Sequence, residues 1–383
     1  MRIVSKKTLS LQQFFQLILI MSTIGFWIKN SRSVALPQSL LPCLTAIVLC
    51  IGQEGFVWWL CIPILLGVAA THLGMNLADD YFDYKHDSHL RSDITGKSVR
   101  ARMEKCHYLV PKDGQEALAP GERKATIDQL GWAVVAFLSF AGVMGGIAFA
   151  TQWIIHGWQA AIGIFLYAGL GLFIGINYAG KPLELGYHGL GELVIGTIFG
   201  PLLMLGVQTA MTGNIFTWPM LCLSVGIGCM VTNIVYVHSV MEVHADAQMG
   251  KMTFARLLNG KGENSLWGKR LMIIFIGIFA LMPFVMLGIG IYFGWWSPWF
   301  LATLITLPMS IYLIHSTRLF AFDLPRTDKP RWWMGPMGDW DTYVKIGMDW
   351  FLYRWLLARN ICTFFCLVLM ITHIVMLFTN STN

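Results

Sequence analysis

Charged residues are scarce in this chain of 383 residues, in which Asp, Glu, Lys and Arg make up only 13%. A typical soluble domain contains about 25%. Hydrophobic residues make up 56%, so a soluble fold of this length would not find enough polar surface to cover itself. The composition therefore excludes an ordinary soluble globular protein and a disordered chain. It predicts an integral protein of the lipid bilayer.

The sequence also lacks any CxxC pair among its eight cysteines. Seven of them lie in or beside apolar runs, where a reduced thiol packs as a small apolar side chain. This distribution excludes a disulfide scaffold and a cysteine metal site of the usual spacing. The formal net charge of +6 follows the membrane topology described below, so we expect no nucleic-acid partner.

Nine apolar runs are long enough, or nearly so, to cross a membrane. They lie at 36–52, 56–76, 129–149, 159–177, 192–211, 217–237, 271–293, 297–315 and 360–379. The runs are continuous rather than alternating, which favours helices, and an open sheet would leave backbone groups unpaired in lipid. We therefore predict an all-α bundle of nine transmembrane helices that forms one domain over residues 1–383.

Lysine and arginine are absent from alternate connections of this topology. All 27 fall on one side, and none occurs near 53–55, 150–158, 212–216 or 294–296. By the positive-inside rule the charged side is cytoplasmic. The rule places the N-terminus inside and the C-terminus outside, in agreement with an odd number of spans.

Two further segments flank the predicted spans. Within residues 1–30, the apolar stretch 12–28 would place Lys6 and Lys7 on the wrong side if it crossed. It is therefore interpreted as an interfacial helix, with a cleaved signal peptide as the alternative. The segment 316–359 is interpreted as an amphipathic cytoplasmic insertion. Its tryptophans Trp332, Trp333 and Trp350 would anchor it at the headgroups, and a lid over the site is the alternative.

A first acidic motif follows the second span. Asn76, Asp80, Asp83 and Asp87 are spaced by 4, 3 and 4 residues, so they share one face if the helix continues. Three carboxylates stacked in this way repel one another near a membrane, unless their pKa values rise or a cation neutralises them. Oxygen ligands alone select a hard divalent ion, which predicts Mg²⁺.

A second acidic motif follows the sixth span, four spans later. Glu242 and Asp246 are at i and i+4, and Gly250 and Lys251 come shortly after. The matching positions suggest two four-helix pseudo-repeats plus a ninth helix, with both acidic faces at the mouth of one cavity. Such a site would hold Mg²⁺ and a diphosphate. The alternative is a solvated acidic helix end.

These motifs resemble those of the UbiA superfamily of intramembrane prenyltransferases. The stretch from Asn76 to Tyr84 (NLADDYFDY) is similar to that of the 1,4-dihydroxy-2-naphthoate polyprenyltransferase branch. Residues 187–192 (YHGLGE) and 199–201 (FGP) resemble segments of the same branch, and Tyr178-xx-Lys181 resembles a loop that contacts diphosphate in the superfamily. The nine spans and the positions of both motifs agree with that fold.

The resemblance implies transfer of a polyprenyl group from polyprenyl diphosphate to an aromatic acid acceptor. In the naphthoate branch the acceptor is 1,4-dihydroxy-2-naphthoate, and the product is demethylmenaquinone. The enzyme would lie in a bacterial cytoplasmic (inner) membrane with its active site on the cytoplasmic side. The expected Mg²⁺ ligands are Asn76, Asp80, Asp83, Asp87, Glu242 and Asp246. The expected catalytic residues are Asp80, Asp83 and Asp246, and the expected diphosphate contacts are Tyr178, Lys181, Lys251 and Arg256.

Three positions depart from the family pattern. Asp79 replaces a usual Asn, Glu242 replaces a usual Asp, and Met241 stands where an Arg often precedes it. Another aromatic acceptor of benzoate, homogentisate or porphyrin type is therefore an alternative, and so is a catalytically silent relative. A transporter is disfavoured, because transporters usually bind at the midplane and these acids cluster at one surface.

Overall fold

The computed structural model describes residues 23–86, 106–110, 123–248, 252–260 and 265–380. Within these residues the regular elements are helices, and the only β-pairing is an isolated bridge between Leu109 and Ala125. Nine of the described helical stretches are long and apolar enough to cross a membrane. The predicted all-helical bundle of nine spans is therefore confirmed. The orientation of its two ends in the membrane stays a prediction.

The described elements follow one another along the chain in three parts. The first part comprises α2 (Thr23–Asn30), α3 (Pro37–Cys50), α4 (Cys61–His86), α6 (Ile127–His156) and α7 (Trp158–Ala179). The middle comprises α8 (Gly191–Thr197), the π-helical turn η4 (Ile198–Leu202), α9 (Leu203–Thr212), α10 (Trp218–Met241), α11 (Val243–Gln248) and α12 (Phe254–Asn259). The last part comprises α13 (Leu266–Tyr292), η5 (Pro298–Thr306), α14 (Leu307–Ala321), α15 (Trp340–Lys345) and α16 (Asp349–Asn380).

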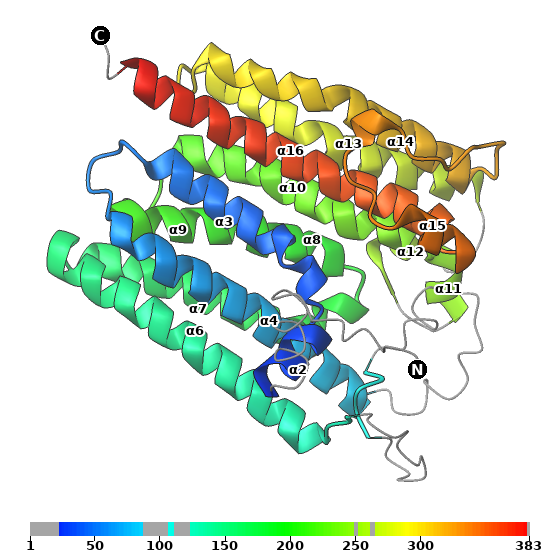
Figure 1. The fold of residues 1–383 in the computed structure, drawn as a ribbon, viewed down its shortest axis with the longest axis horizontal. Helices are drawn as coiled ribbons and strands as arrows, with labels where there is room; N and C mark the ends of the chain where they lie inside the picture. The colour runs from blue at the N-terminus through cyan, green and yellow to red at the C-terminus, as the bar shows by residue number, and fades with distance from the viewer. Residues whose placement is uncertain (1–22, 87–105, 111–122, 249–251, 261–264, 381–383) are drawn as a thin grey trace, which may run out of the picture.

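The long helices run side by side along the longest axis of the molecule (Figure 1). Helices α4, α6 and α7 pack on one another on one side, and α10, α13, α14 and α16 pack together on the other. Helix α10 is buried along most of its length, with α13 and α16 against it. The short helices α2, α11, α12 and α15 gather at one end of the bundle, and the C-terminus lies at the opposite end (Figure 1).

The segment Phe199-Gly200-Pro201 interrupts the fifth span. Pro201 has no backbone N–H to donate and would clash in a regular α-helix, and here the chain forms a π-helical turn over Ile198–Leu202. Phe199 stacks on His72 with the ring centroids 5.1 Å apart. His72 is held in turn by Ser39, with Nδ1 and Oγ 2.6 Å apart. The turn therefore fixes an aromatic ring between three spans.

Several spans extend beyond the apolar runs that predict them. Helix α4 continues through the acidic motif to His86 instead of ending at 76, and α16 begins at Asp349 instead of 360. Helix α14 runs to Ala321. The connection between the last two spans is therefore residues 322–348, which is shorter than the segment 316–359 expected from hydropathy.

Candidate functional site

One large cavity of about 1180 Å³ passes through the bundle. Ile64 and Asp80 of α4 both line it, and their separation of 16 positions along the helix corresponds to about 24 Å at 1.5 Å per residue. Its walls along α6, α7 and α9 are apolar, while charged and polar side chains line its other end. We call this space the central cavity. It can hold a long apolar chain with a charged head at one end.

The first acidic motif lies at the charged end of the central cavity. The Asp80 side chain is buried, with 3% of its surface exposed, and its Oδ1 lies 3.2 Å from Nη2 of Arg32. Tyr108 donates a hydrogen bond of 2.9 Å to Oδ2 of the same carboxylate. Arg32 also bonds Asp79 at 2.9 Å, and Asn76 donates to the Ser31 carbonyl at 2.9 Å. The short turn before α3 is thus fastened to the acidic face of α4.

The charge of Asp80 raises the pKa values of its two partners, Arg32 and Tyr108. Burial by itself would lower the pKa of Arg32, but Asp80 and then Asp79 outweigh it, and the net shift is upward. Burial also raises the pKa of Tyr108, and the nearby Asp80 raises it further. Arg32 therefore stays a cation and Tyr108 stays a hydrogen-bond donor at any physiological pH.

The segment that joins α7 to α8 contacts the first acidic motif, and the start of α8 contacts the start of α12. Tyr187 donates a hydrogen bond to Oδ1 of Asp83. Glu192 is buried, and both of its carboxylate oxygens accept from the backbone N–H of Phe254 at 3.1 Å. This bond fixes the start of α12, where the Thr253 side chain caps the helix by accepting from the Arg256 N–H at 3.3 Å.

The second acidic motif lies just beyond the end of α10. Glu242 is 3% exposed and bonds Nε2 of His238, one turn earlier, at 2.8 Å. Asp246 is also 3% exposed, and its Oδ1 has no hydrogen-bond partner in the part of the chain that the structure describes. Arg256 donates through Nη1 to the Asp246 carbonyl at 3.4 Å. Asp246 lines a small space of about 40 Å³, which we call the side pocket.

The central cavity and the side pocket adjoin each other. Tyr178, Val235 and His238 line both spaces. The end of α4 and helix α11 also lie at the same end of the bundle (Figure 1). The fold thus brings Asp80 and Asp246 to neighbouring spaces at one end, although they are far apart in sequence.

Not all of the other residues predicted to bind diphosphate or metal lie at these two spaces. Tyr178 lines both spaces. Lys181 is exposed in the loop after α7 and lines neither space. Asp87 and Lys251 lie outside the described residues.

The donors suit a hard cation, although they do not form a closed cage. Among the described residues, no group of three or more His, Cys, Asp or Glu side chains is close enough to hold a metal alone. Mg²⁺ does not need one, because it is usually held by one or two carboxylates together with water and substrate phosphates. The buried Oδ1 of Asp246 is an oxygen whose charge no described hydrogen-bond donor satisfies. The residues present therefore fit Mg²⁺ when a diphosphate completes the site.

Sequence reasoning did not single out Arg32, Tyr108 or His238 for the site. All three line the central cavity, and each touches a predicted acidic residue. For His238 a signal was present, because it lies four residues before Glu242 on the same helix face. For Tyr108 no local signal exists, since its partner is 28 residues away.

The chain is similar in sequence to several known proteins. The model of the UbiA prenyltransferase family matches residues 129–334. A 1,4-dihydroxy-2-naphthoate octaprenyltransferase of Mycobacterium tuberculosis is 24% identical over 76% of this chain and 85% of its own. A 2-carboxy-1,4-naphthoquinone phytyltransferase of Synechocystis is 29% identical over 49% of this chain and 50% of its own. A solved UbiA homologue from Archaeoglobus fulgidus, bound to GPP and Mg²⁺, is 13% identical and covers 88% of this chain and 99% of its own, with a TM-score of 0.45.

Proposed function

This chain belongs to the UbiA prenyltransferase family, and we propose that it transfers a polyprenyl group from its diphosphate to 1,4-dihydroxy-2-naphthoate. The observation that supports the proposal most is the central cavity, which joins a long apolar space to buried carboxylates at one end. The names of the relatives favour a naphthoate acceptor. The product would be demethylmenaquinone in its reduced form.

The charged end of the cavity suits departure of the diphosphate. The C–O bond to the allylic carbon breaks, and its electron pair leaves with the diphosphate. Asp80, Glu242 and Asp246, with Asn76 and Asp83, would hold Mg²⁺, which supplies positive charge to the leaving group when bound. Arg256 would add a fixed cation beside Asp246, and Tyr178 would orient the phosphate from the wall between the two spaces.

The rest of the cavity suits the allylic cation and its tail. Water would quench the cation, and the apolar walls of α6 and α7 exclude it. The Phe199 ring, held by His72, faces this space and can stabilise the cation by cation–π attraction. The acceptor carbon that bears the carboxylate then attacks, carbon dioxide leaves, and the ring regains aromaticity.

The active site would face the cytoplasm of a bacterial cell. Support comes from the 27 Lys and Arg residues, all of which belong to connections on one side of the predicted topology. The short helices α2, α11, α12 and α15, together with the acidic motifs, lie at one end of the bundle (Figure 1). Polyprenyl diphosphates and naphthoate would therefore be drawn from the inner side of the membrane.

The activity is tested with purified protein, an eight-isoprene diphosphate and a panel of aromatic acids. We expect product with 1,4-dihydroxy-2-naphthoate, release of carbon dioxide in equal amount, and loss of product with EDTA that added Mg²⁺ restores. Product with only a hydroxybenzoate or homogentisate would move the proposal to another acceptor. Absence of product with every acceptor, from folded protein with Mg²⁺, would refute the proposed function.

The donor tail gives a separate prediction at Gly145 of α6. Gly145 lines the central cavity, and a Cβ built there meets no atom within 4 Å. In Gly145→Leu the side chain fills space that a long tail needs, while Leu favours the helix more than Gly does. We expect kcat/KM for an eight-isoprene donor to fall about tenfold relative to a two-isoprene donor.

The matched control is Gly288→Leu in α13. A Cβ there also meets no atom within 4 Å, but Gly288 does not line the cavity. The control should leave the ratio of long-donor to short-donor activity unchanged. If Gly145→Leu treats both donors alike, the tail does not pass along α6.

A further inference from the structure

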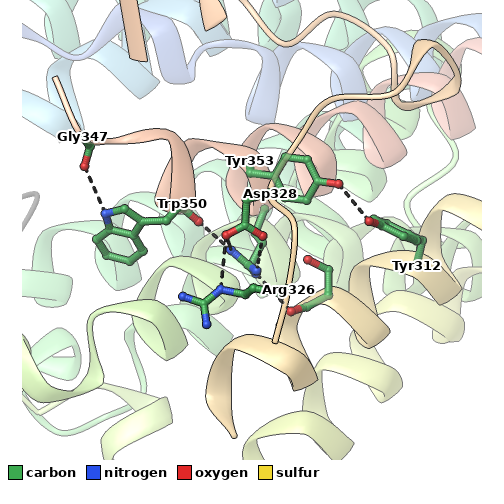
Figure 2. Close-up of polar contacts among 8 residues, drawn as sticks. Tyr312, Arg326, Asp328, Gly347, Trp350 and Tyr353 are labelled. Carbon is green, nitrogen blue, oxygen red and sulfur yellow. Dashed lines mark hydrogen bonds and ion pairs between the residues drawn. The ribbon is translucent and has the colours of Figure 1, made fainter. Parts of the chain in front are cut away.

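The connection between the last two spans is tied to the start of α16 by an ion pair between Asp328 and Arg354. Arg354 is fully buried, and its Nη2 donates to Oδ1 of Asp328 at 2.7 Å while Nη1 approaches Oδ2 at 3.2 Å. The same guanidinium donates to the carbonyls of Trp350 at 2.7 Å and Ser316 at 3.2 Å. Figure 2 shows Asp328 on the connecting segment, with dashed lines that mark the contacts of its carboxylate.

Aromatic contacts reinforce the same attachment. Phe320 at the end of α14 stacks on Trp350 with centroids 5.6 Å apart and planes at 2°, and the Arg354 guanidinium lies 4.9 Å from the centre of Phe320. The hydroxyl groups of Tyr312 and Tyr353 lie 3.0 Å apart (Figure 2). These contacts fasten α14 to the first turns of α16. The connection 322–348 is tied to α14 in turn by Arg326, whose guanidinium lies 4.9 Å from the centre of the Phe320 ring.

A second attachment lies one turn and a half further along α16. Asn360 donates through Nδ2 to the carbonyls of Met334 at 2.8 Å and Pro336 at 2.9 Å. The connection is therefore attached to α16 at two places, Arg354 and Asn360. We call the connection 322–348 the brace.

The braced turns of α16 form one wall of the central cavity. Phe351, Leu352 and Trp355 line it, whereas Arg354 faces the brace. The Phe351 ring packs edge-on against His238, with centroids 4.9 Å apart and planes at 84°, and His238 bonds Glu242. Because the brace holds the start of α16, it also sets the position of the aromatic wall that this helix presents beside the second acidic motif.

This wall differs from the surface that would hold the donor tail. It lies beside His238, which bonds Glu242 of the second acidic motif, and not along the glycine-containing faces of α6 and α7. Aromatic rings bind a flat aromatic ligand by stacking or edge contacts.

We propose that Phe351 and Trp355 form the wall against which the aromatic acid acceptor binds, and that the brace positions this wall through the Asp328–Arg354 pair. The inference rests on the proposed function and adds to it the residues that select the acceptor. Phe351 and Trp355 are specificity-determining residues. Asp328 and Arg354 are positioning residues that do not touch the acceptor.

The test compares Phe351→Leu and Trp355→Leu with wild type and with the control Phe378→Leu at the far end of the same helix, where the ring is 71% exposed. The readouts are the Kd of labelled 1,4-dihydroxy-2-naphthoate by equilibrium dialysis and the separate KM values for acceptor and donor. We expect the acceptor Kd and KM to rise about tenfold in each wall variant, with the donor KM within about twofold of wild type. The control should change neither value.

The brace is tested by Asp328→Asn alone and combined with Phe351→Leu. If the brace acts through the wall, Asp328→Asn raises the KM for the acceptor but not the KM for the donor. When Asp328→Asn is combined with Phe351→Leu, the acceptor KM rises little above that of Phe351→Leu. Should Asp328→Asn fail to fold, Asn360→Ala, which releases only the second attachment, takes its place in the same cycle.

The outcomes separate this inference from the proposed function. If the wild-type protein shows no turnover with any acceptor, the proposed function is refuted. The dialysis would still show whether Phe351 and Trp355 contribute to binding of the acceptor. Wall variants that bind the acceptor like wild type, or that weaken donor and acceptor equally, overturn the inference even if the enzyme is active. Additive effects in the combined variant overturn the role of the brace.

Discussion

Replacing Asp246 with asparagine is expected to lower the rate of prenyl transfer at least about a hundredfold while leaving the fold intact. The reason is that the Asp246 carboxylate is buried and lines the side pocket, yet its Oδ1 has no hydrogen-bond partner among the described residues. A buried charge without such a partner contributes little to stability and is available for a cation or a phosphate-bound metal. Asparagine keeps the size and removes the charge.

The same loss is expected for Asp80→Asn, for a related reason. The amide oxygen can still accept from Tyr108, and Arg32 keeps its bond to Asp79, so the local structure survives the loss of charge. The measurement is kcat/KM at saturating Mg²⁺, with the melting temperature recorded for each variant. Asp128→Asn is the matched control, since this carboxylate is exposed in the first turn of α6 and lines neither the central cavity nor the side pocket. Full activity in Asp246→Asn would show that the second motif does not hold the leaving group.

The nine spans could be predicted because lipid imposes a simple rule on sequence. Every backbone group must find its partner within its own helix, so the length of each apolar run reports a span. The ends of spans follow a different rule. Helix α16 begins 11 residues earlier than its apolar run suggests. Its first turns contain the charged residues Asp349 and Arg354, which a hydropathy pattern assigns to a connection. Arg354 is tolerated there because Asp328, 26 residues earlier, neutralises it, and no hydropathy pattern contains that pairing.

Spacing in the sequence singles out the acidic residues of the candidate site, whereas it does not single out the side chains that these residues contact. Repeats of three and four place side chains on one helix face, which singled out Asp80 and Asp246. Arg32 lies 47 residues before Asp79 in the sequence and meets it only because α3 packs beside α4. The sequence interpretation counted Arg32 among the charges that orient the protein in the membrane. In the structure it lines the cavity and bonds a carboxylate, so a cation just before a span can serve the site as well as the topology.

The motif Phe199-Gly200-Pro201 was identified by its resemblance to a family segment, but the resemblance does not explain why these three residue types occur there. The structure supplies the reason in three parts. Phe199 presents its ring to the cavity, Pro201 lies within the π-helical turn, and Gly200 lies directly on α10. The requirement for glycine comes from a helix in another part of the sequence, which spacing within one span cannot reveal.

Replacing Gly200 with alanine is therefore expected to destabilise the protein by about 3 kcal/mol. A Cβ at this position would lie 2.5 Å from the Ser224 carbonyl oxygen and 2.6 Å from the Cα of Gly228. Both are backbone atoms of α10, so no side-chain rotation can relieve the contact, and the fifth and sixth spans must move apart. In detergent the melting temperature should fall by roughly 5 °C or more, with a lower yield of folded protein.

Gly288→Ala in α13 is the matched control for this prediction. A Cβ at Gly288 meets no atom within 4 Å, and alanine favours a helix over glycine by about 1 kcal/mol, so the control should keep or raise the melting temperature. Because Phe199 precedes Gly200 and stacks on His72, any Gly200→Ala protein that does fold should also show reduced turnover. A Gly200→Ala variant as stable as Gly288→Ala would mean that the fifth and sixth spans are not packed as closely as the structure places them.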